Sequence, residues 1–207
     1  MGIPKKKNDN KFTYKDYCSW PEDERWELID GEAYDMSPAP SRKHQKISGI
    51  LYSKIYDFLK GNNCEIYAAP FDVFLPNYID QDTDDIFNVV QPDLSVICNP
   101  IKLIDKGCYG APDLIIEILS PSTSKKDLNE KFQLYEKHGV QEYWIIDPGN
   151  KYIQVFHLQS EGKNSGKYDE GILIPPANWR EDKNTTAESV VLEGFTVDVK
   201  ELFDSLM

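Results

Sequence analysis

Two carboxylates in the middle of the chain have sequence surroundings that suit the binding of a metal ion. Glu117 interrupts an otherwise apolar run, Leu-Ile-Ile-Glu117-Ile-Leu, that is typical of a buried strand. A carboxylate in such a strand is costly to bury unless it is paired, hydrogen-bonded or bound to a metal ion. Asp93, in Gln91-Pro92-Asp93, enters a neighbouring predicted strand, and adjacent strands lie about 4.8 Å apart. We therefore expect Asp93 and Glu117 to converge within reach of one cation.

The chemistry expected of this pair is that of a hard divalent cation. Two carboxylates with open coordination positions suit Mg²⁺, which keeps several waters and binds phosphate oxygens. Such an ion activates water and stabilises charge on a scissile phosphate. Asp113 lies on the same predicted strand face as Glu117, but about 13 Å along it at roughly 3.3 Å per residue, so we do not expect the two to share one ion. The structural alternative is that Pro92-Asp93 and Pro112-Asp113 are simply turns that enter strands.

Two helices are predicted beside these strands. Apolar residues recur at helical spacing over 41–59, where Ser41 can cap the first turn. The second helix is predicted over 122–138, capped by Ser122 or Ser124. Each helix is followed by a glycine that can end it.

The strands are predicted from apolar runs. From residue 41 the order is helix, three strands, helix, strand, and the almost wholly apolar strand 142–146 after a helix is typical of a sheet buried on both faces. The sequence therefore predicts an α/β fold with a central mixed β-sheet, preceded by a hairpin around Asp30-Gly31. The three consecutive strands are predicted over 64–75, bent or broken at Pro70, over 89–98 and over 114–119.

The organisation of the chain is predicted to be simple. Residues 1–11 read as a disordered tail and residues 12–207 as one domain, with its core at about 41–158 and a C-terminal β extension at 159–207. No apolar run approaches the length that spans a bilayer, and the N-terminal lysines are not followed by the apolar stretch of a secretory signal. We therefore expect a cytoplasmic protein with no membrane partner.

Composition narrows the function further. The net charge of −12, from 23 basic and 35 acidic residues, argues against nonspecific binding of nucleic acid, which relies on neutralising phosphates. Residues 61–120 hold 2 basic and 10 acidic side chains, a balance that suits a cation site. The four cysteines lie too far apart for a zinc site, and we expect them to be reduced and mostly buried.

Several motifs together make the chain similar to a known family. The runs Glu117-Ile-Leu-Ser-Pro-Ser-Thr and Glu142-Tyr-Trp-Ile-Ile-Asp-Pro are the most specific of them. With these, the chain resembles the bacterial putative restriction endonuclease family, long classed as a domain of unknown function and abundant in cyanobacteria, a branch of the PD-(D/E)XK nuclease superfamily. The resemblance covers about residues 12–158, and its other motifs are Glu27-Leu-Ile-Asp-Gly, Ser37-Pro, His44-Gln45, Pro92-Asp93, Pro112-Asp113 and Lys131 with Tyr135.

The resemblance implies a restriction-endonuclease-like core and a nuclease that uses Mg²⁺ or Mn²⁺. Carried over residue by residue, Asp93 is the first acid of the motif and Glu117 the second. The position of the motif lysine holds Leu119 here, and a leucine can neither polarise water nor stabilise charge on a phosphorane. Either the enzyme is inactive, or a lysine arrives from another part of the chain. Many DNA-cutting enzymes of this fold act as homodimers, so the resemblance leaves open that a second copy of this chain is a partner. No segment of the sequence identifies an interface.

Lys131 is the best candidate for the missing cation. On the second predicted helix the apolar stripe is Leu128, Phe132 and Tyr135, and Lys131 falls three residues after the first and four before the last. It should therefore point along the packed face toward the sheet. The alternative is a lysine that snorkels at the edge of the stripe.

Other polar residues are auxiliary candidates. Glu27 could bind or orient a metal ion, or be an exposed strand residue, and Asp113 is a further auxiliary acid. His44, at the start of the first helix, could touch a substrate phosphate or be a surface histidine. The basic residues that could grip phosphate near helix N-termini are Arg42, Lys43, Lys46, Lys125 and Lys126.

Two hypotheses of function follow. The first is a Mg²⁺-dependent endonuclease that hydrolyses phosphodiester bonds in DNA, with Asp93 and Glu117 holding the ion and Lys131 assisting the attacking water. The second is a catalytically inactive nuclease-fold protein that binds nucleic acid or a protein partner. The intact carboxylate pair favours the first, whereas Leu119 and the net charge of −12 favour the second.

Overall fold

The computed structural model describes residues 11–21, 23–36, 39–120, 126–175 and 185–206. In these residues the strands form two six-stranded sheets and a short hairpin, β13–β14 (Thr186–Glu188 and Thr196–Asp198). Sheet A has the order β2 (Glu32–Asp35), β1 (Trp26–Ile29), β5 (Val89–Val90), β4 (Asp72–Phe74), β8 (Gly107–Tyr109) and β7 (Leu103–Ile104). Sheet B has the order β12 (Ile172–Ile174), β11 (Tyr152–His157), β10 (Glu142–Asp147), β9 (Leu114–Ile118), β6 (Leu94–Ile97) and β3 (Glu65–Ala68).

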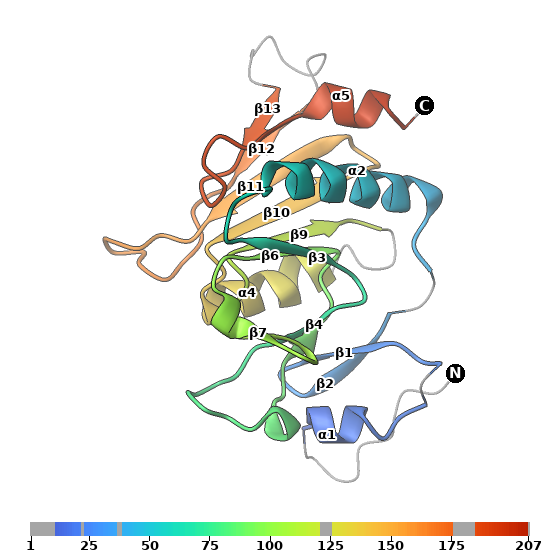
Figure 1. Cartoon of the computed structure of the whole chain (residues 1–207), viewed down its shortest axis with the longest axis vertical. Helices are drawn as coiled ribbons and strands as arrows, with labels where there is room; N and C mark the ends of the chain where they lie inside the picture. Colours follow the sequence, from blue (N-terminus) through green and yellow to red (C-terminus); the bar gives the residue numbers. More distant parts are fainter. Residues whose placement is uncertain (1–10, 22, 37–38, 121–125, 176–184, 207) are drawn as a thin grey trace.

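Sheet B is the predicted central mixed sheet. Strands β9 and β10 pair in parallel, and the other pairs of the sheet are antiparallel. Helices α2 (Arg42–Phe58) and α5 (Val199–Asp204) cover one face, and α4 (Phe132–His138) lies between the other face and sheet A (Figure 1). Burial on both faces explains the nearly continuous apolar runs of β9 and β10.

The two sheets are joined by strands that change sheet. The predicted strand 64–75 is broken at Pro70, as expected, into β3 of sheet B and β4 of sheet A. The predicted strand 89–98 is also broken, which the sequence analysis did not foresee: β5 belongs to sheet A and β6 to sheet B. Proline has no N–H to give to a ladder, so Pro92 marks the break. Asp93 therefore lies where the chain passes from one sheet to the other.

The second helix differs from its prediction. Residues Asp127–Lys131 (η3) form a π-helical turn that continues into α4, and Gly139 ends the helix with a φ of 84°. Leu128, predicted on the packed stripe, is 41% exposed, whereas Asp127 and Lys131 are buried. A π turn holds more residues than an α turn, so the phase of the buried face shifts. The predicted caps Ser122 and Ser124 lie outside the described residues.

The first helix and the N-terminal hairpin agree with their predictions. The Ser41 side chain accepts a hydrogen bond from the His44 N–H at the start of α2. Asp30 and Gly31 have φ angles of 48° and 74° and connect β1 to β2. Positive φ at both central positions is what a tight hairpin turn requires.

The prediction that all cysteines are reduced is wrong for two of them. Cys64 and Cys98 form a disulfide, whereas Cys108 is buried and Cys18 is exposed. The register of β3 on β6 pairs Glu65 with Ile97 and so sets the two cysteines opposite each other. Spacing along the sequence does not reveal such a register.

Additional helices and turns complete the described chain. They are α1 (Tyr14–Tyr17), η1 (Thr83–Asp85) and η2 (Pro100–Lys102). None of the described helices combines the length and apolar character that crossing a membrane requires.

Candidate active site

A cavity of about 60 Å³ lies where the two sheets and two helices meet. It is lined by Glu27 of β1, His44 of α2, Asp93 at the sheet crossing, Glu117 of β9 and Lys131 of η3. The other lining residues are Met36, Gln91, Ile118, Ser120, Lys126 and Asp127. Residues far apart in sequence are thus brought together in one acidic and basic cluster.

Asp93 and Glu117 line this cavity together. One carboxylate oxygen of Asp93, Oδ2, accepts a hydrogen bond of 2.7 Å from the backbone N–H of Ile118, the residue after Glu117. The same oxygen lies 3.0 Å from Nε2 of His44. Glu117 is on the face of β9 that looks toward α4, because alternate residues of a strand point to opposite faces. The chain crossing at Asp93 therefore delivers its carboxylate to the edge of β9 beside Glu117.

Lys131 points into the cavity from the π turn. Its Nζ lies 2.7 Å from Oε1 of Glu117, 2.8 Å from Oε1 of Glu27 and 3.8 Å from Oδ1 of Asp127. The side chain is only 3% exposed, so its charge is compensated by these carboxylates rather than by water. Leu119 is buried in the apolar cluster that includes Tyr135, outside the cavity. A lysine from a different element thus lies beside the second acid.

Glu27 is a buried partner of two lysines. Both Lys126 and Lys131 form ion pairs with its carboxylate, and the Gln91 N–H donates to it over 2.9 Å. Burial alone would raise the pKa of Glu27, but the two ammonium groups outweigh it and lower the pKa to about 2. Glu27 is therefore ionised, and the alternative of an exposed strand residue is wrong.

The opposite balance holds at Glu117. Burial outweighs the attraction of Lys131 and raises the pKa of Glu117 to about 8, with Asp127 and Asp93 adding to the rise. The Tyr135 hydroxyl donates to Oε1 of Glu117 over 2.7 Å. For Lys131, burial lowers the pKa but the carboxylates of Glu117 and Glu27 outweigh it, so the pKa stays well above its usual value. Lys131 is therefore charged, and the carboxyl group of Glu117 changes its protonation near neutral pH.

Two further predicted residues have defined positions. His44 is buried against Asp93, so it is not a surface histidine. Asp113 does not line the cavity. Its carboxylate accepts from the Cys98 N–H over 2.7 Å and from the Gln141 side chain over 3.2 Å, which makes it a structural bridge at the far end of β9.

The predicted phosphate-binding residues differ in their surroundings. Arg42 and Lys43 are exposed in the first turn of α2. Lys126 was predicted to grip phosphate, but its side chain is only 12% exposed and pairs with Glu27. Its Nζ lies 5.8 Å from the centre of the Tyr34 ring. Lys46 donates to the Ser205 carbonyl. Lys125 lies outside the described residues.

Asp127 belongs to the cluster but was not among the predicted site residues, and it contacts Lys131. Tyr135, predicted only on the packed stripe, contacts Glu117, and Lys126, predicted to grip phosphate, contacts Glu27. Asp127, Lys131 and Tyr135 recur at intervals of four, and this spacing was the available signal. This spacing was masked because Leu128, with Phe132 and Tyr135, defined the predicted buried stripe.

The donor set fits a hard divalent ion that keeps part of its water. Among the described residues, Oδ1 of Asp93 and Oε2 of Glu117 accept no hydrogen bond, which leaves one oxygen of each acid for an ion. The described residues contain no group of three or more His, Cys, Asp or Glu that could hold a metal by themselves. Two carboxylates and water are the usual surroundings of Mg²⁺, and about 60 Å³ has room for several waters.

Comparison with known proteins identifies the family. Residues 14–199 match the family described as Uma2, putative restriction endonuclease. The "Uncharacterized protein slr1290" of Synechocystis sp. (strain ATCC 27184 / PCC 6803 / Kazusa) is 30% identical over 155 residues, which make up 73% of this chain and 77% of that protein. The family match reaches residue 199. Most of the C-terminal extension at 159–207, which we placed outside the resemblance, therefore lies within the family match.

A solved structure shows the same fold. It is the crystal structure of "a putative nuclease belonging to DUF820" from Anabaena variabilis ATCC 29413. Its TM-score is 0.71 at 22% identity, over 95% of this chain and 99% of that one, which confirms the predicted α/β fold. Because the family match spans most of the chain, the protein belongs to the Uma2 family of putative restriction endonucleases, and this membership supports a nuclease-type function.

Proposed function

We propose that this protein is a Mg²⁺- or Mn²⁺-dependent endonuclease that hydrolyses phosphodiester bonds in DNA. The observation that carries the proposal is the position of Lys131, whose Nζ lies 2.7 Å from Glu117 in the cavity that Asp93 also lines. The cation that Leu119 cannot supply is thereby available from another element. Asp93 and Glu117 are the proposed metal ligands, and Lys131 is the third catalytic residue.

Each residue has a separate task in this proposal. A bound divalent ion would supply an activated water and neutralise charge on the scissile phosphate. The Lys131 ammonium orients the attacking water and stabilises the negative charge that develops on the phosphoryl oxygens. Tyr135 and Lys131 both donate to Oε1 of Glu117, which leaves Oε2 for the ion. Glu27 also pairs with Lys131 and, with Glu117, keeps it protonated.

The proposal is tested with supercoiled plasmid. Wild-type protein is incubated with Mg²⁺ or Mn²⁺ and compared with Glu117→Ala and with Lys137→Ala as a surface control. Lys137 is an exposed lysine on α4, paired with Asp30 at the surface. We expect nicked or linear plasmid from wild type and Lys137→Ala, and at least a hundredfold slower cutting by Glu117→Ala.

Two results would overturn the proposal. Cutting by Glu117→Ala at the wild-type rate would show that the activity arises elsewhere. Plasmid that stays intact with folded wild-type protein and either ion, while a gel-shift assay shows binding, would establish the inactive nucleic-acid-binding protein instead.

A further inference from the structure

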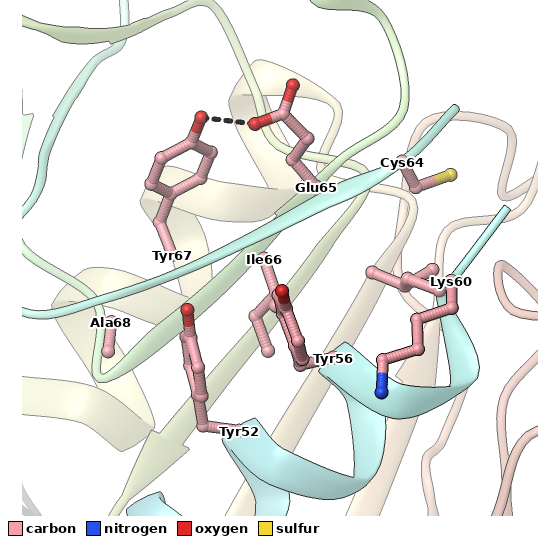
Figure 2. A pocket seen from close by; sticks show the side chains of 9 residues that line it. Tyr52, Tyr56, Lys60, Cys64, Glu65, Ile66, Tyr67 and Ala68 are labelled. Atoms are coloured by element: carbon pink, nitrogen blue, oxygen red, sulfur yellow. Dashed lines mark hydrogen bonds between the residues drawn. The ribbon is translucent and has the colours of Figure 1, made fainter. Parts of the chain in front are cut away.

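A second and larger concavity lies on the outer edge of sheet B. Its volume is about 580 Å³, and it opens between the C-terminal half of α2 and the edge strand β3 (Figure 2). Ile66 and Leu59 contribute apolar surface, and three tyrosines line it, Tyr52 and Tyr56 from α2 and Tyr67 from β3. None of its lining residues belongs to the cavity around Glu117.

The tyrosines of α2 form a pair of parallel plates. The rings of Tyr52 and Tyr56 have centres 6.1 Å apart and planes only 9° apart. Figure 2 shows the two rings side by side, standing up from the helix with their hydroxyls toward β3. They are four residues apart and therefore neighbours on one helix face. The Tyr56 side chain is 54% exposed, which leaves a flat aromatic surface open to a planar ligand.

We propose that this pocket binds an unpaired nucleobase of the DNA strand that passes the active site, a proposal that rests on the proposed function. A base stacks on an aromatic ring whatever its identity, because each base has a π face. Parallel rings suit a flat ligand, whereas an organic cation is held by rings that enclose it on several sides. An unpaired base can reach Tyr56, but a base inside a duplex cannot.

The polar groups of the pocket match the edge of a base. The Tyr67 hydroxyl donates to Oε2 of Glu65 over 2.6 Å, and in the described part of the chain Oε1 of Glu65 accepts no hydrogen bond. A carboxylate oxygen of this kind accepts from an amino group such as N4 of cytosine. The base is neutral, so Glu65 does not repel it as it would repel a phosphate. Nζ of Lys60 lies over the Tyr56 ring, 5.7 Å from its centre, and pairs with Asp57 over 2.7 Å. A base that stacks on this ring face displaces the exposed ammonium, which can then reach the adjoining phosphate.

The pocket and the active site share two elements. The Ala69 N–H, just beyond β3, donates to the Asp93 carbonyl over 3.2 Å, so one end of the pocket adjoins the proposed metal ligand. Helix α2 carries His44 at one end and Tyr56 twelve residues later, a rise of about 18 Å at 1.5 Å per residue. A stacked strand that advances about 3.4 Å per nucleotide covers this distance in roughly five nucleotides. A short unpaired segment can therefore occupy both sites.

The experiment measures stacking directly. A duplex with an unpaired overhang that contains one 2-aminopurine is titrated with the full-length protein in Ca²⁺, and its fluorescence and affinity are recorded. The variants are Tyr56→Ala, the conservative Tyr56→Phe, and Tyr78→Ala as a matched control with an exposed tyrosine (61%) outside the pocket. A fully paired duplex with the same 2-aminopurine is the second probe.

We expect the protein to quench the fluorescence of 2-aminopurine in the overhang but not in the fully paired duplex. Tyr56→Ala should weaken binding of the overhang at least fivefold, whereas Tyr56→Phe and Tyr78→Ala should bind like wild type. Equal affinity of Tyr56→Ala and wild type would overturn the proposal. A concentration-dependent dimer that Tyr56→Ala dissociates, with unchanged binding of DNA, would overturn it in favour of a second copy of the chain.

The plasmid assay separates this proposal from the proposed function. If folded wild-type protein does not cut plasmid but its quenching of the overhang depends on Tyr56, the endonuclease proposal fails and the base pocket stands. If plasmid is cut and Tyr56→Ala changes neither quenching nor affinity, only the base pocket fails.

Discussion

The two faces of sheet B differ in what they bury. The face under α2 and α5 is mostly apolar at β9 and β10, where Leu114, Ile116 and Ile118 pack with Trp144 and Ile146. Its buried acid, Glu142, accepts hydrogen bonds from neutral groups, among them the Trp144 side chain and the Ser189 hydroxyl. The opposite face, under α4, holds Glu117 with Lys131 and Tyr135 in the same layer. One strand therefore contributes to stability with its even-numbered residues and to the candidate site with Glu117. The polar face is tolerated because each buried charge has a partner of opposite charge.

The largest effect is expected from Lys131→Met. This change leaves the carboxylates of Glu27, Glu117 and Asp127 without their shared cation, so the free energy of unfolding should fall by about 3–5 kcal/mol. Urea denaturation measures it. Lys137→Met, which removes an exposed lysine, should change stability by less than about 1 kcal/mol. An unfolding free energy of Lys131→Met equal to that of wild type would show that Lys131 is not needed to neutralise the polar face.

The apolar face is probed by Ile116→Ala. Ile116 is fully buried, and its truncation should lower the free energy of unfolding by about 2–4 kcal/mol through lost burial and a residual cavity. Its cleavage rate per folded molecule should stay at the wild-type value, because Ile116 points away from Glu117. A rate that falls tenfold while the protein remains folded would show that the two faces are coupled.

The free energy of unfolding should depend on pH through Glu117 on the polar face. The pKa of Glu117 is raised from 4.5 to about 8, so its neutral form is favoured in the folded state. The contribution of Glu117 to the free energy of unfolding is therefore fully present below about pH 4.5 and is lost as pH rises through 8. The loss is at most about 1.4 kcal/mol per pH unit. Urea denaturation between pH 5 and 9 without divalent ions should show this slope in wild type and a flatter one in Glu117→Gln. Identical slopes in the two proteins would contradict the raised pKa.

A smaller effect concerns binding of DNA to the polar face. The acidic cluster should repel phosphate until a divalent ion neutralises part of its charge, so labelled DNA should bind more tightly with Ca²⁺ than with EDTA. Arg42 and Lys43 are exposed in the first turn of α2. If both bind phosphate, the slope of affinity against salt should be about −2 on logarithmic axes. Affinity that is the same with and without Ca²⁺ would remove the carboxylates from the binding surface.

The residues of the site that could be predicted from the sequence are those that interrupt an apolar pattern. Glu117 could be singled out because it interrupts an apolar strand, and its strand and face could be predicted from alternation alone. The orientation of Lys131 toward the sheet could also be predicted, but for an incomplete reason, since the stripe included the exposed Leu128 and missed the π turn. Hydrogen bonding of the i to i+5 kind leaves no mark in apolar spacing.

Other features depend on long-range register and could not be predicted. The disulfide of Cys64 and Cys98 follows from the pairing of β3 with β6, and the ion pair of Lys126 with Glu27 follows from the packing of the second helix against sheet A. The passage of the chain between sheets at Asp93 is of the same kind. A proline signals that a ladder ends there, but not which sheet the chain enters next.

The crossing at Asp93 also sets when the site can form during folding. Glu27 comes from sheet A, Glu117 from sheet B, and Asp93 from the segment between them, so the cluster has contacts of high sequence separation. Such contacts form late, after the loops between them have closed. A chain with only one sheet in place has the acids but lacks the cavity that joins them. The candidate site is therefore complete only after the two sheets have assembled, and a partly folded chain lacks it.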